Sequence, residues 1–521
     1  MPNSLTYVDF VEYRSNRNPC LKPLVDLLKN GHKSTTIRNK PNLFWIDFTK
    51  THLDGVLNTQ TTLEAVVRDI VQLKHRVNSP RSAAAPDFRR ILIVEDIDVD
   101  SVTQIGSNLD IDPMFFAHYM LTDFGDIEKT PAPASSSLVP SSFIERDSIH
   151  IHYQQMIDIT VQNQTTPRIY KYKGLGNVPR AVRCLPSLSG GVQPAVMRGC
   201  CSAILKRFEP GSWLCLMLID SSSDVLHPQR KPTNMHIAPS PQNFIPFQGG
   251  FEEFMRPERF SDFATRPKQS QPSKTSFLHN LIWYYRTPPP GFDLENPTLL
   301  SLAYYPIKIS SAHWMLYILI LARYYKYYEY SVNKPHLNSA LETTLVDLQR
   351  WRRRARQSLH KVTTVARFID LYSRPDIRAT TPSSQKKSSV NDDLNQVCDS
   401  LRGDYKNIMA QIEDYSRGME FLISISTTMV QLENGRQSVL EAFNVRRLTY
   451  IVLFFAPLGL VAAIFSMSGE FLPGSSKFWI YAVTALLTLV IVLGVVIVTD
   501  STVQARIHQT FAGKTTRRIQ A

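Results

Sequence analysis

The chain has 521 residues, with 43% hydrophobic and 20% charged side chains, an ordinary balance for globular protein that leaves room for two or three domains. The formal net charge of +13 is dispersed along the sequence, and we find no nucleic-acid-binding module, so no nucleic-acid partner is expected. The six cysteines have no C-x-x-C spacing, which favours reduced thiols packed as small hydrophobic groups over a structural zinc site. Residues 1–13 include Asp9 and Glu12 and no apolar signal region, so they do not resemble a secretory or mitochondrial address.

Residues 1–297 predict an α/β domain with helices on a mixed sheet. Apolar runs at 43–47 and 91–95 each end in an acid, as buried strands do, and a helix begins between them at 61–67. Further strands are predicted at 148–153, 167–172, 201–206 and 213–220. Segments 129–142 and 220–276 are rich in Pro, Ser, Asn and Gln, which predicts loops or partly disordered insertions.

His150 and His152 alternate onto one face of a predicted strand. Such a pair is able to ligate a metal ion in principle, but no third ligand lies nearby in the sequence. We therefore favour a surface or partly buried polar face over a metal site.

Residues 298–372 predict helices beside the α/β domain. The apolar run at 314–322 is about half the length that a membrane span needs, which favours a buried helix. The arginine-rich stretch 350–356 is interpreted as a solvated helix face, or as one that faces acids of a neighbouring subunit.

A linker at 373–390 leads to a predicted stalk helix over 391–447. Apolar residues recur there every three or four positions from Leu394 to Met429, a pattern close to a heptad repeat. A helix of this length must pack against partners, and we expect the equivalent helices of other copies to be those partners.

Two uncharged apolar segments, 448–467 and 478–498, dominate the C-terminal part of the chain. Each has about 20 residues, the length with which an α-helix crosses a hydrocarbon core of ~30 Å. Only the short loop 468–477 connects them, so the two segments predict a transmembrane hairpin.

Basic residues flank this hairpin on one side only. Arg446 and Arg447 precede it and the basic tail 499–521 follows it, whereas the loop carries only Glu470 and Lys477. Because basic flanks stay in the cytoplasm, we expect both termini to be cytoplasmic and the juxtamembrane charge to attract anionic membrane lipid. The plasma membrane is favoured over the vacuolar and the mitochondrial inner membrane.

The end of the first span and the following loop read Phe465-Ser466-Met467-Ser468-Gly469-Glu470-Phe471-Leu472-Pro473. This sequence resembles the signature region of the CorA-type magnesium channels, in which an aromatic residue and Gly-Met-Asn precede a short loop with a Glu and a Pro. Ser466 stands in the place of the Gly and Ser468 in the place of the Asn. Pro457 inside the first span and Phe478-Trp479 at the start of the second also fit the family's layout.

The resemblance implies an α/β N-terminal cytoplasmic domain, a long helical stalk and a C-terminal two-helix transmembrane hairpin. It implies a homopentamer whose first spans line a pore for a divalent cation, Mg²⁺ most of all, with no permanently bound cofactor. The expected ion filter consists of Ser466, Met467, Ser468 and Glu470. At helical spacing the expected pore and gate face consists of Val445, Leu448, Val452, Ala456, Gly459 and Ala463.

Asp98, Asp100 and Asp404 are candidates for a regulatory Mg²⁺ site in the cytoplasmic part, because divalent ions bridge subunits through such acids in the family. Their spacing is not diagnostic, and charges at a strand end or on a surface helix are the favoured interpretation.

Two classes of function remain open. The first is a CorA-like divalent-cation channel or transporter, and the second is a non-conducting, membrane-anchored scaffold or sensor that keeps the CorA architecture. An enzyme is not expected, because the sequence has no phosphate loop, nucleophile elbow or metal-hydrolase spacing.

Overall fold

The computed structural model describes residues 5–30, 40–52, 55–77, 88–120, 146–160, 171–186, 192–208, 211–228, 242–255, 259–261, 276–332, 338–373, 388–466 and 476–499. The chain divides into two compact units. The first comprises Met1–His336 with Val346–Leu422, and the second comprises Leu337–Leu345 with Ile423–Ala521.

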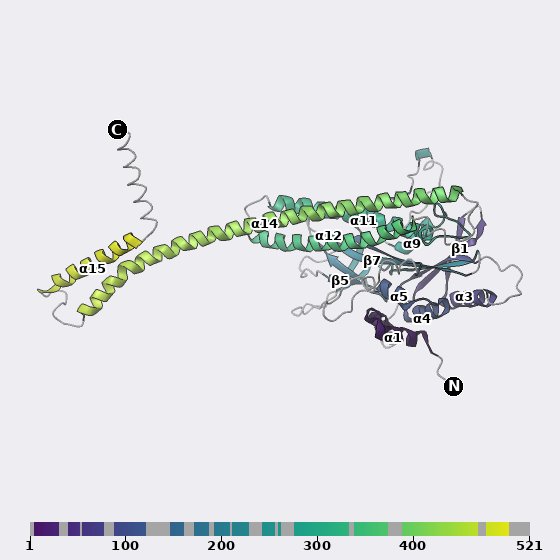
Figure 1. Ribbon diagram of the computed structural model, residues 1–521, viewed down its shortest axis with the longest axis horizontal. Helices are drawn as coiled ribbons and strands as arrows, with labels where there is room; N and C mark the ends of the chain where they lie inside the picture. The colour runs from purple at the N-terminus through teal and green to yellow at the C-terminus, as the bar shows by residue number, and fades with distance from the viewer. Residues whose placement is uncertain are drawn as a thin grey trace. The chain divides into compact units, whose positions relative to one another are not determined.

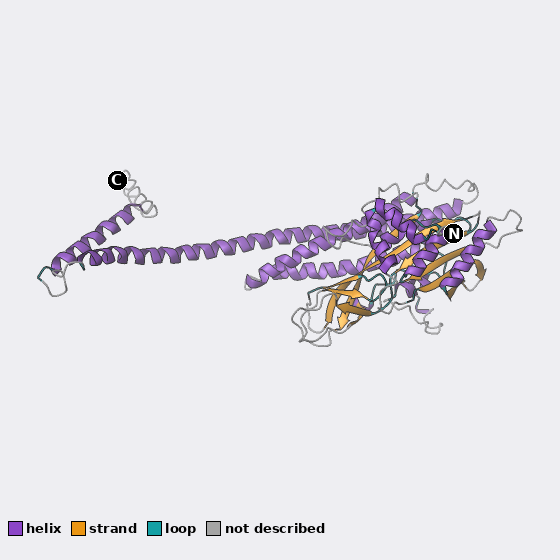
Figure 2. Ribbon diagram, turned by 90° about the horizontal axis from the view of Figure 1, so that it is seen from below, coloured by secondary structure: helices purple, strands orange, loops and turns teal. Residues whose placement is uncertain are grey.

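One ten-stranded sheet forms the centre of the first unit, with its strands shown in orange in Figure 2. Its strand order is β2 (Gly55–Thr61), β1 (Asn42–His52), β3 (Arg89–Glu95), β8 (Trp213–Ile219), β7 (Val192–Arg207), β4 (Ser148–Thr160), β10 (Gln242–Pro246), β9 (Val225–Pro228), β5 (Lys171–Gly174) and β6 (Ala181–Cys184). Among the described strand pairs, β3 and β8 run parallel and the others are antiparallel.

The parallel pair explains why two apolar runs were recognisable as strands. Every residue of β8 is buried, as are the last five residues of β3, from Ile91 to Glu95. A strand covered on both faces has no polar side to alternate with, so its sequence is continuously apolar. The predictions of strands at 91–95 and 213–220 are confirmed.

Helices cover both faces of the sheet (Figure 1). One face carries α1 (Tyr7–Arg17), the 3₁₀ turn Pro19–Leu21, α2 (Lys22–Asn30), α3 (Leu63–Val77), α4 (Val99–Leu109) and α5 (Pro113–Met120). Most of their buried side chains share one core with residues of β1, β3, β7 and β8, while Cys20, Leu21, Met114 and Ala117 form a small cluster of their own. The other face carries α9 (Phe277–Tyr284), α10 (Leu299–Leu302), α11 (Tyr304–Val332), α12 (Asn338–Tyr372) and the beginning of α14 (Ser388–Phe465). The α/β prediction is therefore confirmed as a layered arrangement.

The helix α11 contains the apolar run that we excluded as a membrane span. Trp314, Tyr317 and Leu321 are buried, and the Trp314 indole donates a hydrogen bond of 3.2 Å to the carbonyl of His152 in β4. The prediction of a buried helix at 314–322 is confirmed.

The expectation for residues 220–276 was wrong in part. This interval contains β9, β10 and the 3₁₀ turn Phe247–Gly249, and Leu226 and Phe244 join a small core beneath the end of the sheet. Strands of four and five residues at the side of a sheet bury only one or two apolar side chains, which is too little to stand out in a polar segment.

The stalk helix also differs from its prediction. Up to Leu422 the apolar stripe of α14 is buried within the first unit. Leu401, Tyr405 and Ile412 are buried members of this stripe. Lys308 of α11 contacts Asp404 at 2.5 Å, and Arg402 contacts Asp370 of α12 at 2.8 Å. This part of α14 therefore contacts α11 and α12 of the same chain. The sequence could not predict this, because a heptad-like stripe does not specify whether its partner helix belongs to the same chain or to another copy.

Three acids collect where the parallel strands end. Glu95 and Asp96 follow one another at the end of β3, and Asp220 follows β8. Asp96 is only 5% exposed and has a φ of 59°, while its Oδ1 accepts a hydrogen bond of 2.7 Å from the Asn177 main chain. Its Oδ2 is buried and has no hydrogen-bond partner among the described residues. Burial raises the pKa of this carboxyl to about 6, against the opposing effect of the main-chain hydrogen bonds.

The raised pKa predicts a pH-dependent stability that Asp96→Asn removes. The folded state binds this proton more tightly than the unfolded state, so its contribution to stability is present below pH ~4 and is lost as the pH rises to about 6. Asparagine tolerates the left-handed backbone and remains neutral. From pH 4 to 7 the free energy of unfolding of Asp96→Asn should therefore rise relative to wild type by on the order of 3 kcal/mol. Denaturant unfolding in detergent, followed by tryptophan fluorescence, measures this, and parallel pH profiles would contradict it.

Gly199 lies so close to the Tyr153 ring that the core has no space for a side chain at position 199. A Cβ at Gly199 would lie 2.2 Å from the Tyr153 ring, which is itself stacked between Phe277 and His313. Gly199→Ala should destabilise the protein by about 1–3 kcal/mol. Gly403→Ala is the matched control, because an added Cβ on that exposed helical glycine meets nothing within 4 Å and should stabilise. Equal unfolding midpoints for the two variants would refute the packing argument.

Candidate ion path

The second unit contains the two apolar segments of the predicted hairpin. The end of α14 forms the first, and α15 (Phe478–Thr499) forms the second. Both helices are long and apolar enough to cross a membrane by length and composition. The two segments predicted to span a membrane are therefore both helical in the structure.

One face of α14 packs against α15. Val461 is 6% exposed and Ala485 is 7% exposed, and the rings of Phe465 and Tyr481 meet nearly edge to face with centroids 5.9 Å apart. On α15, Thr484 donates its hydroxyl hydrogen to the Ile480 carbonyl at 2.9 Å, so this polar group is satisfied within its own helix.

The predicted pore residues lie on the opposite face of α14. Val461 is separated from Gly459 and from Ala463 by two residues each, which is about 200° around an α-helix. In the single chain all members of the predicted face are exposed: Val445, Leu448, Val452, Ala456, Gly459 and Ala463. A Cβ added at Gly459 would meet nothing within 4 Å. The structure brings these six residues together on one unoccupied face.

A polar stripe continues this face toward the N-terminal side of the span. Counting back from Val445 in steps of four and three residues gives a set of neutral polar side chains and one acid, all exposed: Glu441, Ser438, Asn434, Gln431 and Thr427. The Thr427 hydroxyl also donates to the Ile423 carbonyl at 2.8 Å. Hydroxyl and amide groups in this position are able to hydrogen-bond water or the hydration shell of a cation.

Most of the expected ion filter lies outside the described residues. Met467, Ser468 and Glu470 belong to that part of the chain. Ser466 is described as an exposed turn residue at the end of α14, and its main-chain N–H donates to the Ala462 carbonyl at 2.9 Å. The filter therefore stays a prediction from the sequence.

The candidate regulatory acids have structural partners. The Asp98 carboxylate caps α4 by accepting a hydrogen bond of 2.8 Å from the Ser101 main chain, and Asp100 lies exposed in the first turn of the same helix. Asp404 forms the ion pair with Lys308. Within the described ranges, no group of three or more His, Cys, Asp and Glu residues is arranged to hold a metal ion. A regulatory Mg²⁺ at these acids stays a proposal.

The two predicted strand histidines are more deeply placed than expected. His150 and His152 are both buried, and burial lowers the pKa of each well below the ordinary range. The His150 Nδ1 lies 2.7 Å from the Ser202 hydroxyl on the neighbouring strand. These imidazoles belong to the core of the first unit.

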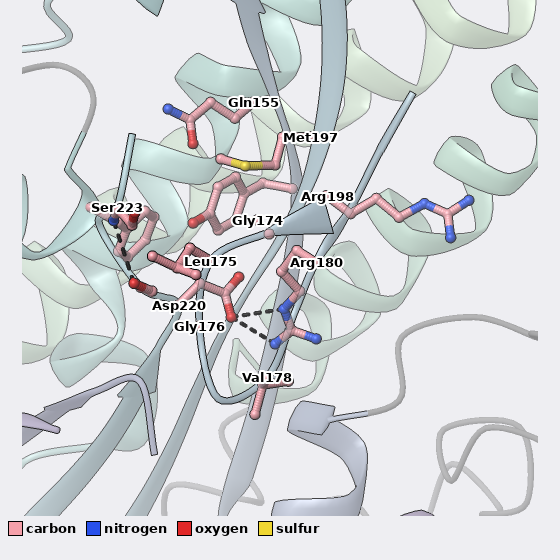
Figure 3. A pocket seen from close by; sticks show the side chains of 14 residues that line it. Gln155, Gly174, Leu175, Gly176, Val178, Arg180, Met197, Arg198, Asp220 and Ser223 are labelled. Atoms are coloured by element: carbon pink, nitrogen blue, oxygen red, sulfur yellow. Dashed lines mark hydrogen bonds and ion pairs between the residues drawn. The ribbon is translucent and has the colours of Figure 1, made fainter. Parts of the chain in front are cut away.

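A small pocket in the first unit lies beside the end of β8 (Figure 3). Its main charged feature is a buried ion pair in which the Arg180 guanidinium contacts Asp220 at 2.7 Å and donates to the Tyr119 carbonyl at 2.8 Å. The second oxygen of Asp220 accepts a hydrogen bond from the Cys200 main chain. Figure 3 shows Arg198 directed away from Asp220. These bonds connect strands and the end of α5, so we assign the ion pair a structural role.

Sequence reasoning missed two features, the polar stripe of α14 and the buried Asp96. The stripe carried a signal, because Glu441, Ser438 and Asn434 follow the same helical spacing as the predicted pore face. Asp96 carried none, since a carboxylate after a strand is ordinarily a solvated strand-end charge.

Comparison with known proteins finds a likeness to CorA-type transporters in the C-terminal part of the chain, where the sequence resemblance lies. The family model described as CorA-like Mg²⁺ transporter protein matches residues 343–499. No curated protein sequence matches the chain. Among solved structures, the CorA magnesium transporter from Methanocaldococcus jannaschii matches with 10% identity and a TM-score of 0.34, covering 88% of this chain and 98% of that one. The full-length CmaX protein matches with 10% identity and a TM-score of 0.33, covering 89% and 98%.

The family match begins within α12, continues through α14 and α15, and contains every residue of the predicted pore face. The likeness to the CorA-like Mg²⁺ transporter family is therefore one of residues 343–499, the part of the chain with the two apolar helices.

Proposed function

We propose that the chain is one subunit of a homopentameric channel that carries divalent cations, Mg²⁺ above all, down the membrane potential. The observation that carries this proposal is the exposed face of α14 opposite α15. A helix that packs on α15 with one side and leaves the other uncovered is suited to stand around a central axis with equivalent helices, while α15 faces the lipid. Val445, Val452 and Gly459 then lie along the pore.

The proposed filter handles hydrated Mg²⁺. This ion holds its inner waters tightly, so a filter works best by hydrogen-bonding the hydration shell. Ser466, Met467 and Ser468 offer hydroxyl and carbonyl oxygens for that purpose. A ring of Ser468 hydroxyls is wider than a ring of asparagine amides, and a ring of Glu470 carboxylates gathers cations at the entrance.

The proposed gate is hydrophobic. Leu448 and Val445 are the bulkiest members of the pore face where the span begins, and both are exposed in the single chain. A ring of such side chains blocks conduction by excluding water when it is narrow. Next to it, the ring of Ser438, Asn434 and Gln431 forms a wet vestibule.

The proposed topology places both termini in the cytoplasm of a cell whose plasma membrane holds the protein. Arg446 and Arg447 lie where the first span begins, which favours the cytoplasmic side for that end. Membrane lipid contacts the outer faces of α15. Asp98, Asp100 and Asp404 remain the proposed contacts for regulatory Mg²⁺ once copies assemble.

A non-conducting scaffold or sensor is the second candidate. It is favoured by one specific observation, namely that all six side chains of the pore face within and next to the span are apolar or absent. Ser466 and Ser468 in place of the family's Gly and Asn point in the same direction. The channel and the scaffold differ in one measurable property, namely whether the protein conducts any cation.

Uptake into liposomes tests the channel directly. Purified protein under an inside-negative potential should take up Mg²⁺, with Co²⁺, Ni²⁺ and Zn²⁺ measured in parallel. Gly459→Phe should lower Mg²⁺ uptake at least about tenfold, because five phenyl rings fill the space around the axis. Glu470→Ala should lower it at low ion concentration, because the entrance loses its negative charge.

The matched control is Leu487→Phe, an equally bulky change on the exposed face of α15. It should leave uptake unchanged, and native mass spectrometry should show five copies for every variant. Absence of uptake from an assembled pentamer, or equal losses for Gly459→Phe and Leu487→Phe, would sink the proposal in favour of the scaffold.

Ser468→Asn separates the two candidate functions most sharply. The longer amide narrows the ring and supplies donors and acceptors to the hydration shell, so Mg²⁺ uptake should rise severalfold. A scaffold has no flux to raise, and an unchanged zero rate for both proteins would support it. Ser476→Asn, at the other end of the loop, serves as the matched control.

A further inference from the structure

The polar stripe of α14 carries one acid, Glu441, directly before the proposed gate. Glu441 precedes Val445 by four residues and Thr449 follows Val445 by four, so the three side chains form one row along the helix. All three are exposed. The sequence from Asn434 to Phe465 contains no other acid, so Glu441 is the negative charge of α14 that lies closest to the gate.

The arginines beside the gate lie on other faces of the helix. Arg446 lies about 100° and Arg447 about 200° from Val445 around the helix, whereas Glu441 lies within about 40° of that residue. The Arg446 Nε donates a hydrogen bond of 2.8 Å to the Tyr450 hydroxyl. Tyr450 lies about 140° from Val445, so this bond directs the Arg446 side chain away from the row.

No base of the same helix lies beside Glu441. Side chains three and four residues apart are neighbours on a helix surface. Around Glu441 these positions hold two amides, one hydroxyl and one aliphatic group, namely Gln437, Asn444, Ser438 and Val445. The charge of the carboxylate is therefore not neutralised by a neighbour on α14.

The row presents hydrogen-bond acceptors. The Thr449 hydroxyl donates its hydrogen to the Val445 carbonyl at 2.8 Å, which leaves its lone pairs for other partners. The ionised carboxylate of Glu441 also only accepts hydrogen bonds. A hydrated cation directs the hydrogens of its water shell outward, so acceptors on both sides of Val445 suit a cation better than an anion.

We propose that Glu441 gives the vestibule before the gate its preference for cations over anions, with divalent cations favoured most. The inference rests on the proposed function, because the carboxylates of several copies must surround one axis. Five negative charges there concentrate cations and exclude anions, and a divalent ion is attracted twice as strongly as a monovalent one. Glu441 is then a specificity-determining residue on the side of the membrane opposite Glu470.

Charged thiol reagents test this preference in the full-length protein in nanodiscs. Ser438→Cys places a thiol one turn from Glu441, and the six native cysteines are all buried. Two methanethiosulfonate reagents, one with a trimethylammonium and one with a sulfonate group, are compared by their labelling rates relative to a small thiol in solution. At an ionic strength of ~0.01 M the Debye length is ~30 Å, so the ratio of the two rates reports the charge of the vestibule.

Glu441→Gln should lower this rate ratio more than about fivefold, and Glu441→Asp should keep most of it. Glu433→Gln is the matched control, because it removes an acid of the same helix that lies about 80° around the helix from Glu441. It should change the ratio less than about threefold.

The size of the effect decides the outcome. One carboxylate at this distance in water changes the ratio by about fivefold, so a larger change requires the carboxylates of several copies. A change of about fivefold or less for Glu441→Gln, or equal changes for the two acids, would overturn the inference. A thiol at Ser438→Cys that neither reagent modifies would overturn it too, because the polar stripe would then not face water.

Labelling needs no ion flux, so the result is separate from the test of the channel. Absence of Mg²⁺ uptake together with a rate ratio that depends on Glu441 would refute conduction and support the cation-attracting vestibule. Uptake with a ratio that ignores Glu441 would refute this inference alone. In a conducting protein, Glu441→Gln should lower uptake severalfold at limiting Mg²⁺ and leave the maximal rate nearly unchanged.

Discussion

The second unit depends on how the apolar end of α14 is packed, with one face against α15 and the opposite face exposed. In hydrocarbon every main-chain polar group must be satisfied within its own helix, and this leaves only side-chain packing to determine which faces meet. The face of α14 with Val461 and Phe465 is taken by α15. The face with Gly459 and Ala463 is free and must meet other copies, lipid or water. The proposed pore is one solution to that requirement.

In the first unit, the beginning of α14 packs against helices of the soluble domain. Up to Leu422, α14 lies on α11 and α12, held by apolar packing and by ion pairs such as Lys308 with Asp404. Beyond that residue α14 belongs to the second unit together with Leu337–Leu345, and its described polar stripe from Thr427 to Glu441 is exposed. The hydroxyl and amide groups of the polar stripe are suited to contact water along the proposed pore axis.

The sequence alone was sufficient where a single physical requirement dominates. Two uncharged segments of membrane-spanning length predicted the hairpin, and the continuous apolar runs of β3 and β8 predicted buried strands. It was insufficient where several structures satisfy one pattern. The stripe from Leu394 to Leu422 has the spacing of a helix that packs on helices, but nothing in that spacing tells α11 from another copy. The strands β9 and β10 were missed because each buries too few side chains. The open Oδ2 of Asp96 depends on atoms brought together from distant parts of the sheet, which no local pattern encodes.

The small residues on the free face of α14 have a mechanical consequence. In the proposed pore, the side chains of Ala456, Gly459 and Ala463 are too short to reach across the axis, so rotamer changes cannot alter the pore width there. The diameter at this depth is then fixed by the distances between main chains. Any closure in the middle of the membrane has to come from rigid displacement or rotation of whole helices, with the slow, collective kinetics of such motions.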